Sequence, residues 1–90
     1  MRNLLICELP LTEQKAPDVR WRACVQWGPL VEHKNRRTAL RRAVQAWLEQ
    51  RETEKVTSFG VNLALKEMNV IQVSRPSGIQ WYNALDGGRG

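Results

Sequence analysis

The feature that most limits the possible folds is a change in hydrophobic spacing between two neighbouring segments. From Val19 to Trp27, apolar residues occupy every second position and mostly polar residues fall between them. This is the spacing of a strand with one buried face. From Thr38 to Arg51, apolar residues recur at i, i+3, i+4, i+7 and i+8, which is the spacing of an amphipathic helix. With Thr38 as its N-cap, a helix over residues 38–51 follows the strand, and a domain that mixes α and β structure is predicted.

The N-terminal part of the chain contains one further strand and one segment that fits two structures. Residues Asn3–Leu11 predict a strand, with apolar side chains on both of its faces toward its beginning. After Gly28 and Pro29 end the second strand, residues Leu30–His33 fit either a third short strand or an irregular lead into the helix. The first half of the chain is therefore rich in β-structure.

The C-terminal part predicts a second helix and then a hairpin. Thr57 or Ser58 supplies an N-cap for a helix over residues 58–68. Over residues 70–82, β-branched and aromatic residues lie on both sides of a turn that contains proline and glycine. We therefore expect a small single α+β domain over residues 1–85, with N-terminal β-strands, two helices and a C-terminal β-hairpin. We expect the glycine-rich residues 86–90 to form a flexible tail.

The predicted core collects the large side chains that follow these two spacings. Trp21, Trp27 and Trp47 all have apolar spacing, which favours packing in the core over stacking on single-stranded bases. Trp81, in the predicted hairpin, either packs or faces a partner. The expected core residues are Trp21, Val25, Leu40, Val44, Trp47, Leu48, Phe59, Leu63 and Ile71.

The sequence carries no signature of catalysis or of a metal or cofactor site. Cys7 and Cys24 have no CxxC spacing, and His33 is the one histidine in the chain, so a metal site would lack ligands. Buried thiols are favoured over a disulfide. No apolar run reaches the length of a membrane span and no signal-peptide layout is present. We expect a cytoplasmic protein that is not an enzyme.

Positive charge is concentrated at the start of the first predicted helix. The chain has a net charge of +5, and five of its cationic residues lie between residues 34 and 42 with no acidic residue among them. Cations are unfavourable at a helix N-terminus, whereas a docked anion is favourable there. This layout indicates a surface that binds phosphate groups or an acidic partner. Its members are Lys34, Arg36, Arg37, Arg41 and Arg42.

A resemblance to a known family rests on short segments of the second half. Residues 43–49 (Ala-Val-Gln-Ala-Trp-Leu-Glu), 59–60 (Phe-Gly), 65–70 (Leu-Lys-Glu-Met-Asn-Val) and 81–82 (Trp-Tyr) occur in an order typical of one family. Through them, residues 38–82 resemble the winged-helix DNA-binding modules, a helix-turn-helix plus a wing, of phage and plasmid proteins. The resemblance implies binding of duplex DNA, with the second helix in the major groove and the wing on the backbone.

Two functional hypotheses follow. The first is a small, basic, non-catalytic protein that binds duplex DNA as a regulator or accessory factor. The alternative is a phage-type inhibitor or adaptor, such as an anti-CRISPR, that binds an acidic protein or ribonucleoprotein surface; the few basic residues of the second helix favour it. The candidate binding residues are Lys34, Arg36, Arg37, Arg41, Arg42, Arg20, Arg22, Asn62, Lys66 and Arg75.

Overall fold

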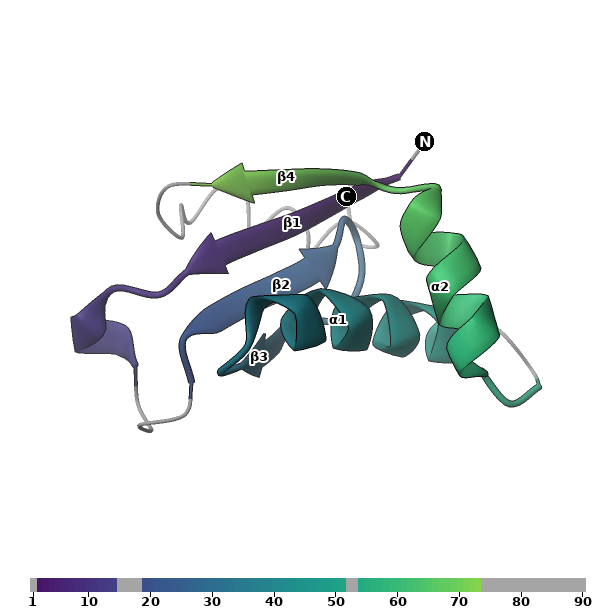
Figure 1. The fold of residues 1–90 in the computed structure, drawn as a ribbon, viewed down its shortest axis with the longest axis horizontal. Helices are drawn as coiled ribbons and strands as arrows, with labels where there is room; N and C mark the ends of the chain where they lie inside the picture. Colours follow the sequence, from purple (N-terminus) through teal and green to yellow (C-terminus); the bar gives the residue numbers. More distant parts are fainter. Residues whose placement is uncertain (1, 15–18, 52–53, 74–90) are drawn as a thin grey trace.

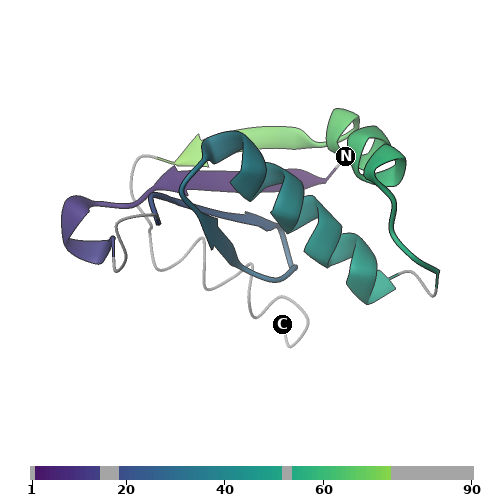
Figure 2. The ribbon, with the colours of Figure 1, turned by 60° about the horizontal axis from the view of Figure 1, so that its bottom comes forward.

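A four-stranded mixed sheet and two helices make up the fold in the computed structural model (Figure 1). The structure describes residues 2–14, 19–51 and 54–73. Helix α1 lies across one face of the sheet, and α2 lies beside it at the end of the sheet where β4 begins (Figures 1 and 2). The elements are β1 (Asn3–Glu8), a short 3-10 helix (Leu11–Glu13), β2 (Trp21–Val25), β3 (Val31–His33), α1 (Arg36–Arg51), α2 (Ser58–Lys66) and β4 (Asn69–Val73).

The strand order is β3-β2-β1-β4, so the last strand lies beside the first. β1 is antiparallel to β2 and parallel to β4, and Ile6 of β1 pairs with Ala23 on one side and with Gln72 on the other. A parallel neighbour cannot be reached through a tight turn. The two helices supply the crossover that carries the chain from β3, at one edge of this sheet, to β4.

The main core lies between the sheet and α1. Leu4 and Ile6 of β1, together with Ala23 and Val25 of β2, point toward the helices and are fully buried. On α1, the buried residues are Ala39, Leu40, Ala43 and Val44. The alternation predicted for the second strand is confirmed from Trp21 to Val25, because Trp21 packs on the same cluster.

The opposite face of the sheet is also buried, which explains why the first strand is apolar on both sides. Leu5, Cys7 and Cys24 form a second cluster, with Leu30, Ile71 and Val73 packed against it. Strands buried on both faces lose the simple alternation of apolar and polar residues. The prediction of buried thiols is confirmed, since Cys7 and Cys24 are both buried. Burial raises the pKa of Cys24 to about 12.

The two helices are confirmed, with a corrected start for the first. The amide of Ala39 donates to the carbonyl of Asn35 at 2.9 Å, so α1 begins at Arg36 and Thr38 lies inside its first turn instead of capping it. The cap of α2 is confirmed, because the hydroxyl of Thr57 accepts a hydrogen bond from the Gly60 amide at 3.1 Å. The segment that fitted two structures is a strand, β3.

The predicted orientation of the second helix was wrong. Phe59 and Leu63 were expected in the core but are 70% and 49% exposed. Val61 is buried instead, and Ala64, Leu65 and Met68 pack beside it on the core. Phe59 and Leu63 are four residues apart, and the second set follows i, i+3, i+4 and i+7. Both sets fit one face of a helix, so spacing alone could not choose between them. Val61 and Ala64 are the smaller side chains and permit a closer approach to α1.

The prediction that Trp27 packs in the core was also wrong. The amide of Gly28 donates to the carbonyl of Val25 at 2.7 Å, so the chain turns as β2 ends and the alternation stops. Trp27 adopts a left-handed conformation with φ of 69° in this turn and is 46% exposed.

The C-terminal prediction is tested only in part. A strand was expected from residue 70, and β4 confirms it. β4 pairs with β1 in parallel. The second strand of the hairpin, its turn, Trp81 and the tail at 86–90 lie outside the described residues.

Candidate functional site

The arginines of the second strand do not join the basic residues of α1. Arg20 forms an ion pair with Glu8 at 2.7 Å. Arg22 donates from Nε and Nη2 to one carboxylate oxygen of Glu32, at 2.9 and 2.8 Å. Each of these cations is therefore balanced by a glutamate of a neighbouring strand or strand end. The face of the strand that carries Arg22 is also the one opposite α1, since Cys24, two residues on, belongs to the second cluster.

Arg36 lies at the end of the sheet where β1 and β4 finish. Its Nε donates to the side-chain oxygen of Gln72 at 3.1 Å. Its guanidinium also lies over the ring of Trp21, 5.8 Å from the ring centre. Two strands thus hold this side chain in place while it remains exposed. Gln72 and Trp21 were not predicted as parts of the site, and their spacing in sequence gives no sign of this contact.

Arg41 extends toward α2. Its guanidinium donates to the amide oxygen of Asn62, and its side chain lines a small hollow between the helices together with Thr57, Ser58 and Val61. Arg37 is one turn earlier on the same side of the helix. The structure therefore joins two predicted site residues, Arg41 and Asn62, by a direct hydrogen bond.

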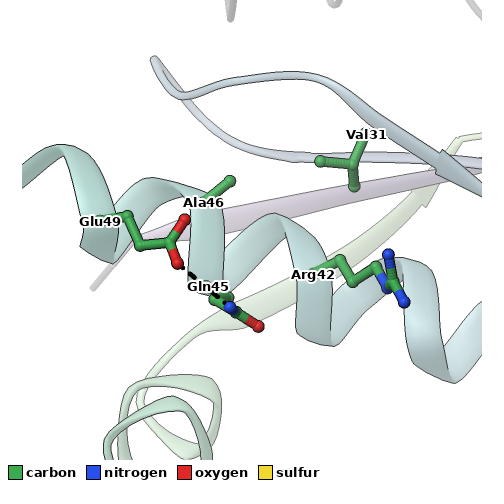
Figure 3. Close-up of a pocket in the computed structure, with 5 residues that line it drawn as sticks. All are labelled: Val31, Arg42, Gln45, Ala46 and Glu49. Atoms are coloured by element: carbon green, nitrogen blue, oxygen red, sulfur yellow. Dashed lines mark hydrogen bonds between the residues drawn. The ribbon is translucent and has the colours of Figure 1, made fainter. Parts of the chain in front are cut away.

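Arg42 extends toward β3. It lines a shallow surface hollow together with Val31, Gln45, Ala46 and Glu49 (Figure 3). The carboxylate of Glu49 accepts a hydrogen bond from Gln45 at 3.1 Å and does not pair with Arg42. Arg42 and Glu49 lie at opposite ends of the row of side chains in Figure 3. The cations of α1 therefore extend from its first two turns toward three neighbours, the end of the sheet, α2 and β3, instead of forming one flat patch.

The basic residues at the start of α1 form no ion pair in the described part of the chain. Within the described ranges, the ion pairs are the two on the sheet, Arg20–Glu8 and Arg22–Glu32. The first turn of α1 contains no acidic residue. Positive charge is therefore unbalanced around the start of α1. We call Lys34, Arg36, Arg37, Arg41 and Arg42 the α1 basic surface.

The exposed side of α2 is the second feature of this region, and we call Phe59, Asn62, Leu63 and Lys66 the α2 outer face. All four are exposed, and their spacing of i, i+3, i+4 and i+7 puts them on one side of the helix. Sequence reasoning identified Asn62 and Lys66 but put Phe59 and Leu63 in the core. The signal that could have found them is the second apolar stripe of the same helix. Arg75, the remaining predicted residue, lies outside the described residues.

Trp47, near the end of α1, packs against the core and carries two cations. The guanidinium groups of Arg2 and Arg51 lie 5.1 and 4.8 Å from the centre of its ring. On another side, a Cβ added to Gly28 would come within 3.0 Å of a ring carbon of Trp47. This cluster ties the turn after β2 to α1, so we assign it to stability rather than to binding.

No family model, curated protein or solved structure matches this chain significantly. In the part of the chain that the structure describes, no helix is both long and apolar enough to cross a membrane. Function must therefore be inferred from the residues of the two helices.

Proposed function

We propose that the protein binds duplex DNA, with the α1 basic surface on the phosphate backbone. The observation that carries the proposal is the contrast between the two groups of arginines. Those of the sheet are paired with Glu8 and Glu32. The start of α1 is basic and has no acidic residue in its first turn; its cations are exposed, apart from the half-buried Arg41. Unbalanced cations at a helix N-terminus oppose folding slightly. A bound phosphate would reverse that penalty.

The arrangement of the cations fits phosphates better than bases. Arg36, Arg41 and Arg42 extend toward three different sides of a helix segment roughly 10 Å long. Guanidinium groups spread in this way can contact several phosphates of one backbone, and such contacts position a protein without reading sequence. The side chain that best suits base reading, Asn62, already accepts a hydrogen bond from Arg41.

A winged-helix mode would instead put α2 in the major groove. Its outer face offers DNA one amide and one ammonium group, from Asn62 and Lys66, between the apolar Phe59 and Leu63. Groove-reading helices use polar and cationic side chains for base edges and phosphates. We therefore propose that α1 makes the main contact. A wing at Arg75 would add a backbone contact.

Fluorescence anisotropy with a labelled duplex tests this function. Affinity should fall steeply between low and physiological salt, because binding releases counterions from the phosphates. Arg37→Glu combined with Arg42→Glu should weaken binding and flatten the slope of log affinity against log salt by about one to two units. Thermal stability should stay constant or rise, because the helix N-terminus loses unfavourable cations. No binding at low salt would overturn the proposal and leave the protein-partner hypothesis.

A further inference from the structure

The outer face of α2 has the spacing of a helix face that packs against another surface. Phe59, Asn62, Leu63 and Lys66 follow the i, i+3, i+4, i+7 positions. The opposite side of the helix already supplies the contacts that hold it in the fold, through Val61 and its neighbours. Phe59 and Leu63 are therefore not needed for the attachment of α2, yet they leave two large apolar side chains in water, 70% and 49% exposed.

These two side chains are adjacent to each other. Residues four apart lie on the same side of a helix, separated by one turn or about 6 Å along the axis. Scattered single apolar residues are normal on protein surfaces, whereas adjacent apolar residues bordered by polar ones are typical of binding faces. Asn62 and Lys66 provide that polar border on one side of Phe59 and Leu63.

The charges around this face are positive. Lys66 lies on the face itself, and the guanidinium of Arg41 reaches its edge through the hydrogen bond to Asn62. Arg37 is one turn from Arg41 on the same side of α1. Glu67, the C-cap of α2, is the exception. α2 itself contains no acidic residue, and the acidic residues that precede Glu67 in the sequence are Glu54, Glu52 and Glu49. The chemistry that complements this face is apolar at its centre and acidic at its border.

We propose that the α2 outer face is a docking surface for an acidic amphipathic helix of another protein. Apolar residues of the partner at i, i+3 or i+4, and i+7 would pack over Phe59 and Leu63, as helices do in helix-in-groove recognition. Carboxylates beside them would meet Lys66 and Arg41. A second copy of this chain fits less well, because it would bring Lys66 and Arg41 against the same cations and carries a net charge of +5 itself.

This surface is separate from the DNA contact proposed above, although Arg41 borders both. Selection from a random peptide library displayed on phage, with the full-length chain as bait, tests it directly. We expect the enriched peptides to combine helical apolar spacing with aspartate and glutamate. Binding of a labelled peptide from that pool should weaken at least tenfold in Phe59→Ser/Leu63→Ser, and several-fold in Lys66→Glu. Leu11→Ser is the control, because Leu11 is 85% exposed and lies in the short 3-10 helix, far from α2 in the sequence. This variant should bind the peptide normally.

The double variant should retain its thermal unfolding transition and its affinity for duplex DNA, because neither side chain is buried and neither belongs to the α1 basic surface. Enrichment of no peptides, of basic peptides, or of peptides that bind the double variant equally well would overturn the proposal. So would a concentration-dependent dimer in sedimentation that Phe59→Ser abolishes, since the occupant would then be a second copy. Loss of DNA affinity in Phe59→Ser/Leu63→Ser would assign the face to nucleic acid and would also overturn it.

Discussion

Arg41 of α1 donates a side-chain hydrogen bond to the amide oxygen of Asn62 on α2. This contact joins the basic helix to Asn62, which the sequence analysis names as a candidate binding residue. Because the exposed amide oxygen already accepts a hydrogen bond from this chain, we infer that Asn62 orients Arg41. The contact lies between two candidate binding sites, a phosphate-binding surface on α1 and a base-reading surface on α2.

Asn62→Ala distinguishes those two sites. If Asn62 orients Arg41, its loss should change discrimination among duplex sequences by less than about 0.5 kcal/mol, against the roughly 1–3 kcal/mol that a base-reading amide contributes. Affinities for a panel of duplexes at one salt concentration measure this. A drop in discrimination above 1 kcal/mol would instead place α2 in the groove.

The orientation of α2 predicts a large loss of stability when Val61 is truncated and a small one when Phe59 is truncated. Val61→Ala should destabilise the protein by about 1–3 kcal/mol, because it leaves a cavity in the main core. Phe59→Ala should change the free energy of unfolding by less than about 0.5 kcal/mol, because the ring is mostly in water. Urea denaturation gives both values, and the reverse order would mean that the helix is rotated.

Gly28 and Trp47 should be energetically coupled. A methyl group at residue 28 would meet the Trp47 ring and the carbonyl oxygen of Val25, each at 3.0 Å, so Gly28→Ala should cost about 1–3 kcal/mol. Trp47→Ala should cost about 3 kcal/mol, because the ring packs on the core and carries Arg2 and Arg51. In a double-mutant cycle, Gly28→Ala should lower the free energy of unfolding by less when Trp47 is already replaced by alanine. Full additivity would show that the turn and the helix do not touch.

The buried thiol of Cys24 predicts a loss of stability in alkali. Its pKa is raised from 9.0 to about 12 by burial, so the folded state keeps the proton that the unfolded state releases above pH 9. The contribution to stability is complete below pH 9 and declines as the pH rises toward 12, by up to about 1.4 kcal/mol per pH unit. Cys24→Ala should flatten this decline in urea titrations at successive pH values. An unchanged slope would place the thiol in contact with water.

Periodicity predicted those elements in which one face differs clearly from the other. Trp21, Ala23 and Val25 alternate with polar residues and with Cys24, and Leu40, Ala43 and Val44 recur with helical spacing; both patterns correspond to buried faces in the structure. The pairing of β4 with β1 could not be predicted in this way. It depends on a crossover between strands more than sixty residues apart in sequence, and no local pattern encodes that choice.

Contacts between side chains of different elements could not be predicted from the sequence. Arg20 and Arg22 were grouped with the α1 cations by charge alone, but the sheet register brings them to Glu8 and Glu32. Phe59 and Leu63 were placed in the core because α2 has two apolar stripes and its contacts with α1 decide which one is buried. Charge density identified the start of α1, and only the three-dimensional structure shows that its cations extend in three directions.

The central claim is that position, and not total charge, makes α1 the DNA-binding surface. The most direct test compares two variants with the same net charge by fluorescence anisotropy across a series of salt concentrations. Arg37→Gln/Arg42→Gln removes two cations from the α1 basic surface, and Arg20→Gln/Lys55→Gln removes two from elsewhere on the exposed surface. We predict that the first pair lowers the salt slope by about one to two units, whereas the second leaves it within about half a unit of the parent. Equal losses in the two pairs would contradict the account, because attraction would then follow net charge alone.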